Sequence, residues 1–140
     1  MRIMGLDVGS KTIGVAVSDP LGWTAQGVTT IRRKNKAADV DALKQLVARY
    51  GVEEVVVGLP RNMNGTFGPR AGEARAFAAR LEAELGVPVH LYDERLSTVA
   101  ADKILLEADL SRRRRRAVVD QVAASIILQG YLDRRGQNRV

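Results

Sequence analysis

The chain has 140 residues, no cysteine, and a formal net charge of +6 from 22 Lys and Arg against 16 Asp and Glu. The lack of cysteine excludes disulfides, thiolate metal sites and cysteine nucleophiles, and no apolar run approaches the length of a membrane span. We therefore expect a single domain over residues 1–140 in the cytoplasm. The basic charge favours an anionic partner, with nucleic acid as the first candidate and an acidic membrane surface as the second.

The first part of the chain predicts three strands that follow one another directly. Residues 2–8 and 12–18 are rich in β-branched and apolar residues, which favour strands. The connection at residues 9–11 (GSK) is short and contains glycine, so it predicts a β-hairpin. A third strand around residues 25–31 is expected to continue an antiparallel meander.

Helical and strand patterns alternate through the rest of the chain, with Gly51 and Gly86 as expected helix stops. The expected elements are a helix at 38–50, a strand at 53–59, a loop at 62–68, a helix from Pro69, a strand at 87–92, and helices at about 97–107 and about 116–133. A basic run around Arg112 is expected to divide the last two helices. This order predicts one α/β domain: a mixed five-stranded sheet, three antiparallel strands followed by two parallel ones, with helices on both faces.

Asp7 lies near the carboxyl end of the first predicted strand, just before the hairpin turn. Period-two alternation puts it on one face with Ile3 and Gly5. A carboxylate in a central strand is costly to desolvate unless a cation compensates its charge. The alternative is a strand-end aspartate that accepts hydrogen bonds from the N–H groups of the turn.

Asp93 and Glu94 end the fifth predicted strand, at the edge where the ligand sites of open α/β sheets lie. Successive strand residues face opposite ways, so both carboxylates cannot point into one cleft while the chain stays extended. One of them is expected to be a ligand and the other a structural partner, such as a helix cap or the mate of an arginine. The alternation by itself leaves open which is which.

Asp120 lies in a very apolar helical segment, where it shares a face with Ala124 and Tyr131. A carboxylate buried there needs a cation or a full set of hydrogen-bond donors. The alternatives are a salt bridge to one of Arg112 to Arg116 and a favourable position in the first helical turn. Small residues beside it, including Ala123, would let this helix approach the sheet closely.

The three acids, on the first strand, the fifth strand and the last helix, can converge at one edge of the sheet. Oxygen-only ligation suits Mg²⁺ or Mn²⁺, which also bind substrate phosphates. Two such ions activate the attacking water and stabilise the leaving oxygen, so no protein nucleophile is needed. His90, the only histidine, lies within a strand and is interpreted as a half-exposed sheet residue.

Four motifs, in chain order, resemble those of one family: the YqgF/RuvX family of pre-16S rRNA nucleases and Holliday junction resolvase homologues. They are residues 7–14 (DVGSKTIG), residues 58–66 (GLPRNMNGT), residues 93–98 (DERLST), and Asp120 followed by Ala123-Ala124 and residues 126–128 (IIL). The resemblance spans nearly the whole chain, and the four motifs together are specific where any one of them would be weak.

The resemblance implies an RNase H-like fold and a metal-dependent nuclease that matures the 5′ end of the 16S rRNA precursor. It carries Asp7, Glu94 and Asp120 over as catalytic residues and as ligands of Mg²⁺ or Mn²⁺, and so favours Glu94 over Asp93. The expected partner of this monomer or homodimer is precursor rRNA or branched DNA, with ribosomal particles as a further one. The alternatives are a Holliday junction resolvase and a ribosome- or nucleic-acid-binding factor with little catalysis.

The chain departs from the true resolvases of the wider superfamily, which set two acids one helical turn apart on the last helix. The positions one turn from Asp120 are Arg116, Ala117, Ala123 and Ala124. With only three acids, a second metal ion is expected to bind weakly or only with substrate. A phosphotransferase of the actin/hexokinase type also opens with an Asp-x-Gly hairpin, but that fold needs two such domains.

Basic and amide side chains supply candidate contacts to nucleic acid. The hairpin turn holds Lys11 four residues from Asp7, where it can bind a phosphate. The other candidates are Arg61, Asn62, Arg70, Arg95, Arg112, Arg113, Arg114, Arg115 and Arg116. The five consecutive arginines are interpreted as a phosphate-binding patch, with a solvated charge run as the alternative. Trp23 is interpreted either as a base-stacking residue or as a hydrophobic plug.

Overall fold

A computed structural model describes residues 1–59, 68–93 and 112–137, and within the last range the side chains of residues 119–135. The elements in chain order are β1 (Arg2–Val8), β2 (Thr12–Ser18), β3 (Ala25–Arg32), α1 (Lys36–Tyr50), β4 (Val52–Leu59), α2 (Pro69–Leu85), β5 (Val89–Asp93) and α4 (Arg112–Gln137). Their order agrees with the prediction throughout the described ranges. The helix predicted at 97–107 lies outside those ranges, as does the loop predicted at 62–68 except for its last residue.

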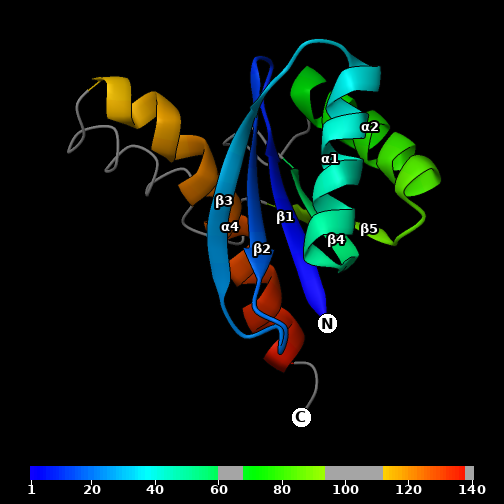
Figure 1. The fold of residues 1–140 in the computed structure, drawn as a ribbon, viewed down its shortest axis with the longest axis vertical. Coiled ribbons are helices and arrows are strands. Elements are labelled where there is room, and N and C mark those ends of the chain that lie inside the picture. Colours follow the sequence, from blue (N-terminus) through cyan, green and yellow to red (C-terminus); the bar gives the residue numbers. More distant parts are fainter. Residues whose placement is uncertain (60–67, 94–111, 138–140) are drawn as a thin grey trace.

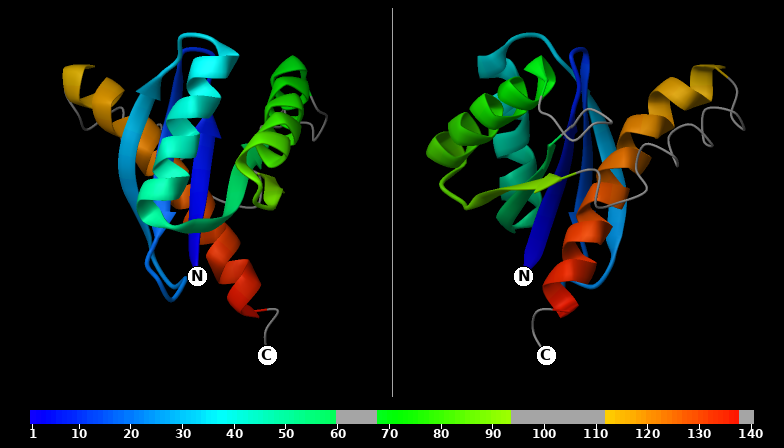
Figure 2. Two further views of the ribbon diagram at one scale, coloured as in Figure 1. Left: turned by 45° about the vertical axis from the view of Figure 1, so that its right-hand side comes forward. Right: turned by 180° about the vertical axis from the view of Figure 1, so that it is seen from behind.

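The strands form one mixed sheet in the spatial order β3-β2-β1-β4-β5 (Figure 1). The pairs β1–β2 and β2–β3 are antiparallel, and the pairs β1–β4 and β4–β5 are parallel. Helices α1 and α2 cover one face of this sheet and α4 crosses the other (Figure 2). The predicted arrangement, three antiparallel strands followed by two parallel ones between helical layers, is thus confirmed.

Each face of the sheet has its own core, and β1 contributes to both because its side chains alternate. Met4 and Leu6 belong to the core beneath α1 and α2, whereas Ile3 belongs to the core beneath α4. The helix stops expected at Gly51 and Gly86 are also observed, since both residues have the left-handed backbone conformation that ends a helix (φ 62° and 69°).

Helix α4 differs from the expected helix at 116–133, because it begins at Arg112 and ends at Gln137. The run of arginines therefore forms the first turns of α4 instead of dividing it from another helix. Arginine is among the better helix formers, and the run contains neither proline nor glycine to interrupt a helix. Figures 1 and 2 show these first turns, at the yellow end of the helix, projecting beyond the sheet.

The contact between α4 and the sheet is close, as the small residues of the helix predict. Ala123 and Ala124 are both fully buried. The sheet contributes a matching glycine, because a Cβ built on Gly5 would lie only 2.6 Å from the Cβ of Leu128. No helix in the described part of the chain is long and apolar enough to cross a membrane.

A buried glutamate in β4 joins the carboxyl-terminal half of α4 to the sheet. Glu54, 7% exposed, lies 2.8 Å from Nη1 of Arg135 and 2.9 Å from Nε2 of His90, and it accepts a hydrogen bond from the hydroxyl of Tyr131. Burial, with the bond to Glu54 as a second cause, raises the pKa of Tyr131 to about 12. His90 is 46% exposed, which confirms its interpretation as a half-exposed sheet residue.

Glu54→Ala is expected to lower the free energy of unfolding by about 3 kcal/mol, since it leaves the groups around Glu54 without their partner. This expected loss is at the low end of the range for breaking a buried ion pair, because Arg135 and His90 are partly exposed to water. Urea denaturation measures the change. The neighbouring Glu53 is exposed, so Glu53→Ala should change stability by less than about 0.5 kcal/mol; equal losses for both variants would contradict this role of Glu54.

Candidate functional site

Asp7 is a nearly buried carboxylate at the carboxyl end of a central strand. It is the last residue but one of β1 and is only 7% exposed. Its alternation with Ile3 and Gly5 puts its side chain on the face that α4 covers, because Ile3 lies in the core beneath α4 and Gly5 abuts Leu128. Asp7 thus shares one face with Ile3 and Gly5, as the alternation along the strand predicts.

Asp120 reaches the same place from α4. The residue opposite Asp7 on β2 is Gly14, and a Cβ built on Gly14 would lie 1.9 Å from the backbone oxygen of Asp120. Residues directly opposite each other in an antiparallel pair share a face. The side chain of Asp7 and the backbone of Asp120 therefore lie next to the same glycine.

A hydroxyl from β2 orients the carboxylate of Asp120. Oγ1 of Thr12 donates a hydrogen bond of 2.7 Å to Oδ2 of Asp120. Thr12 begins β2, directly after the turn that follows Asp7. Sequence reasoning did not single out Thr12 as a functional residue, although it lies within the first motif; a hydroxyl next to a turn carries no signal that identifies its partner 108 residues away.

The pairing of β5 with β4 shows which face of the sheet Asp93 occupies. Alternation along the sequence had left open whether Asp93 or Glu94 is the ligand. Asp93 pairs with Leu59 of β4, and Leu59 lies in the core beneath α1 and α2. Parallel register partners share a face, so Asp93 faces away from α4, whereas the preceding residue, Tyr92, is buried in the core beneath α4. Asp93 is thus on the face opposite to Asp7. Glu94 lies outside the described residues.

The donors around Gly14 are suited to a hard cation. Two carboxylates and a hydroxyl offer only oxygen, the ligand type that Mg²⁺ and Mn²⁺ prefer. Within the described ranges no group of three His, Asp or Glu side chains is placed to hold a metal ion. Two of the three predicted acids are described, and the third, Glu94, falls in the gap after β5.

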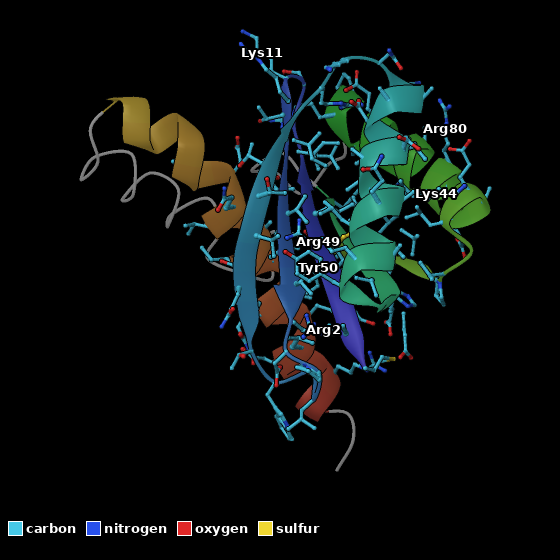
Figure 3. The ribbon with its side chains drawn as sticks, viewed as in Figure 1. Arg2, Lys11, Lys44, Arg49, Tyr50 and Arg80 are labelled. Atoms are coloured by element: carbon cyan, nitrogen blue, oxygen red, sulfur yellow. The ribbon has the colours of Figure 1, made fainter. Side chains whose placement is uncertain are left out.

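The candidate contacts to nucleic acid are placed only in part. Lys11 is exposed in the turn between β1 and β2, and its side chain extends away from the tip of that turn (Figure 3). Arg70, the second residue of α2, is exposed and lines a cavity together with Gly9 and Ser10 of the same turn. The remaining candidates lie outside the described residues or have side chains outside them: Arg61, Asn62, Arg95, Arg112, Arg113, Arg114, Arg115 and Arg116.

The positive charge of the chain is concentrated in α4. Residues 112–137 contain seven arginines and two aspartates, so they carry a formal charge of +5 out of +6 for the whole chain. The five arginines at positions 112–116 precede Asp120 by four to eight residues, or about 6 to 12 Å along a helix axis. Most of the net charge is thus on the helix that carries Asp120.

An arginine that sequence reasoning missed braces the turn next to Asp7. Nη1 of Arg33 donates to the carbonyl oxygen of Gly9 at 2.8 Å, and its Nε donates to the buried carboxylate of Asp39 at 3.0 Å. The backbone N–H of Arg33 also donates to the carbonyl of Lys11. Its guanidinium lies over the ring of Phe77, 5.2 Å from the centroid. No local pattern in the sequence marks this residue, because its partners come from three separate elements.

Trp23 lies away from these residues. It follows β2, whose seven residues span about 20 Å from the turn near Asp7. Its side chain is 67% exposed, so the interpretation as a hydrophobic plug is wrong, and base stacking stays a prediction.

Comparisons with known proteins agree on a relationship across the chain. A family model described as "RuvX: Holliday junction resolvase" matches residues 1–134. A protein of Moorella thermoacetica named "Putative pre-16S rRNA nuclease" is 76% identical over 140 residues, the full length of both chains. One with the same name from Listeria monocytogenes is 61% identical over 135 residues, covering 95% of this chain and 98% of that protein.

The solved structure of T. thermophilus RuvC in complex with Holliday junction substrate superposes with a TM-score of 0.57 at 19% identity. The superposition covers 97% of this chain and 96% of that one. A likeness at this identity shows the fold, which is RNase H-like, as the family resemblance implies.

Proposed function

The chain belongs to the RuvX family, and on that premise we propose that it is a nuclease that hydrolyses phosphodiester bonds in structured nucleic acid, with the 5′ end of the 16S rRNA precursor as its substrate. The names of the full-length relatives support the choice of substrate. The net positive charge, most of it on α4, supports an anionic polymer as the partner.

The meeting of Asp7 and Asp120 at Gly14 is the observation that carries this proposal. Burying Asp7 costs free energy that a purely structural role could avoid with a neutral side chain. A second carboxylate on the adjacent helix makes that cost larger, because like charges repel. A divalent cation between the two would compensate both charges, so the arrangement is better suited to binding a cation than to stabilising the fold.

We assign the third acid to Glu94. Asp93 faces the opposite side of the sheet from Asp7, which leaves Glu94 as the acid of this pair available to the same site. The family resemblance favours the same residue. Asp7, Glu94 and Asp120 would hold Mg²⁺ or Mn²⁺, and such an ion would lower the pKa of a water molecule and neutralise charge on the phosphate.

The other residues of the site position these acids and the substrate. Thr12 holds one oxygen of Asp120 in place through its hydroxyl. Gly14, which has no side chain, leaves room for the backbone of Asp120 next to β2. Lys11, exposed at the tip of the turn, binds a phosphate of the substrate, and the arginines at 112–116 neutralise further backbone charge.

Cleavage of two substrates tests this function. Purified protein is incubated with a 5′-extended 16S rRNA precursor and with a four-way DNA junction, each with Mg²⁺, with Mn²⁺ and with a chelator. We expect cleavage of the precursor that requires the metal. Symmetric cleavage of the junction alone would identify a resolvase, and binding of either substrate without cleavage under any condition would identify a nucleic-acid-binding factor.

A further inference from the structure

A cavity of about 460 Å³ lies beside the turn that follows β1, on the face of the sheet opposite to Asp7. The turn between β1 and β2 forms one wall through Gly9 and Ser10, and the first turns of α2 form the opposite wall. Arg33, in the connection from β3 to α1, and Lys36, the first residue of α1, also line the cavity. Val8, which also lines the cavity, packs against the core beneath α1 and α2, whereas Asp7 faces α4. The cavity and the carboxylate site thus share one turn but occupy opposite faces of the sheet.

The charge of this cavity is suited to an anion. Its lining includes Lys36 and Arg70 against one acid, Glu73, together with Arg33, whose charge is paired with that of Asp39. Arg33 is held in a fixed orientation by Asp39, Gly9 and the ring of Phe77, so it loses little further freedom on binding. The side chains of Lys36 and Arg70 are exposed, and neither has an ion-pair partner within the described part of the chain.

The amino terminus of α2, on the opposite wall of the cavity, also contributes positive partial charge. Helix α2 begins with Pro69 after Gly68, without a side-chain cap and without an acidic residue in its first turn. The positive end of its dipole therefore adds to the charge of Arg70. By contrast α1 begins with a cap from Asn35 and has Asp39 in its first turn, so its amino terminus is already compensated.

We propose that this cavity binds a backbone phosphate of the same nucleic-acid strand whose scissile phosphate lies beside Asp7 and Asp120. The inference rests on the proposed function for the position of the scissile bond. A strand that crosses the turn between β1 and β2 has one phosphate on each face of the sheet. Lys36 and Arg70 neutralise the flanking phosphate, and the turn, braced by Arg33, fixes its distance from the carboxylates. The cavity thereby sets the register of the strand in the site.

The test measures binding without cleavage, so it stays informative if the proposed nuclease activity fails. The double variant Lys36→Ser/Arg70→Ser is compared with Lys44→Ser/Arg80→Ser, which removes the same charge from the same two helices outside the cavity lining (Figure 3). Affinity for a single-stranded RNA is measured without metal across a series of salt concentrations. The first variant should reduce the slope of log affinity against log salt by about 1.4, since each contact with a single strand contributes about 0.7.

The control variant should change that slope by much less. Equal changes for the two variants would overturn the proposal, because they would reflect net charge alone. An unchanged slope for Lys36→Ser/Arg70→Ser would overturn it as well. Circular dichroism and thermal melting establish that both variants are folded.

Single neutral phosphates locate the contact. DNA strands that carry one methylphosphonate at successive positions are bound to wild type and to Lys36→Ser/Arg70→Ser. For each strand, the affinity of the double variant is compared with that of wild type. This difference should be smaller when the methylphosphonate stands at one or two adjacent positions, because the cavity then has no charged phosphate to bind. At all other positions the difference should equal that for the unmodified strand. A loss that is the same at every position would contradict a fixed phosphate site. Adenosine monophosphate is also tested as a competitor, at the same phosphate concentration as the strand. If it competes as strongly as the strand, the cavity binds a free nucleotide instead.

Discussion

Replacing Asp7 with asparagine is expected to abolish metal-dependent cleavage while the protein stays folded. Asparagine keeps the shape of the side chain but loses the charge that would hold the cation. A bound ion contributes several kcal/mol to transition-state stabilisation, so the rate should fall by about a thousandfold or more. The melting temperature should not fall, because a buried carboxylate is costly to desolvate. Cleavage of the rRNA precursor and thermal melting together measure both effects.

Asp41→Asn is the matched control for Asp7→Asn. Asp41 is an exposed residue of α1 that accepts a hydrogen bond from the side chain of Gln45. Its replacement makes the same chemical change away from the site, and the cleavage rate should stay within about twofold of wild type. Full activity of Asp7→Asn would exclude Asp7 from catalysis, and unfolding of this variant would assign Asp7 a structural role.

Of the glycines whose surroundings the structure describes, Gly14 is the one at which an added methyl group should have the largest effect. The new Cβ would lie 1.9 Å from the backbone oxygen of Asp120 and 2.4 Å from its carbonyl carbon. Backbone cannot move aside as the end of a flexible side chain can, so α4 must shift as a whole. We expect a loss of about 3 kcal/mol or more and a fall in melting temperature of roughly 10 °C or more. Cleavage should fall too, because the shift carries Asp120 away from Asp7.

Gly72→Ala, by contrast, should stabilise the protein. Nothing lies within 4 Å of a Cβ built on Gly72, which occupies an interior position of α2. Alanine there should raise the free energy of unfolding by about 0.5 to 1 kcal/mol, since it restricts the unfolded chain and favours the helix. Thermal melting that ranks Gly14→Ala at or above wild type would contradict the close contact between α4 and β2.

The strands and their faces could be predicted because they depend on local pattern. Alternation along β1 is visible in the sequence, and it placed Asp7 on one face with Ile3 and Gly5. The structure then shows that α4 covers this face. The apolar character of the last helix predicted that it would be buried, and its buried residues form one core with the sheet. The family resemblance, which rested on four motifs, is confirmed by the match to residues 1–134.

The features that could not be predicted depend on register between elements far apart in the chain. The contact of Gly14 with Asp120 requires the pairing of β1 with β2 and the crossing point of α4, and neither is encoded near Gly14 itself. The orientation of Asp93 follows from its pairing with Leu59. Likewise, the role of Arg33 emerges only when Asp39 and Gly9 are brought to it by separate elements.

The beginning of α4 shows the limit of composition as a guide to helix boundaries. A run of five arginines resembles a solvated linker because its like charges repel. The intrinsic helix propensity of arginine and the continuity with the apolar segment that follows outweigh that repulsion in the structure. As a result the charge is held on a regular helix that leads directly to Asp120.

The most direct test of the central claim is Mn²⁺ binding to the wild-type protein and to Asp7→Asn and Asp120→Asn, measured by isothermal titration calorimetry without nucleic acid. The claim is that Asp7 and Asp120 hold one cation together, so each variant should bind Mn²⁺ at least about tenfold more weakly than wild type. Mn²⁺ affinity that is the same in all three proteins would contradict a shared site at Gly14.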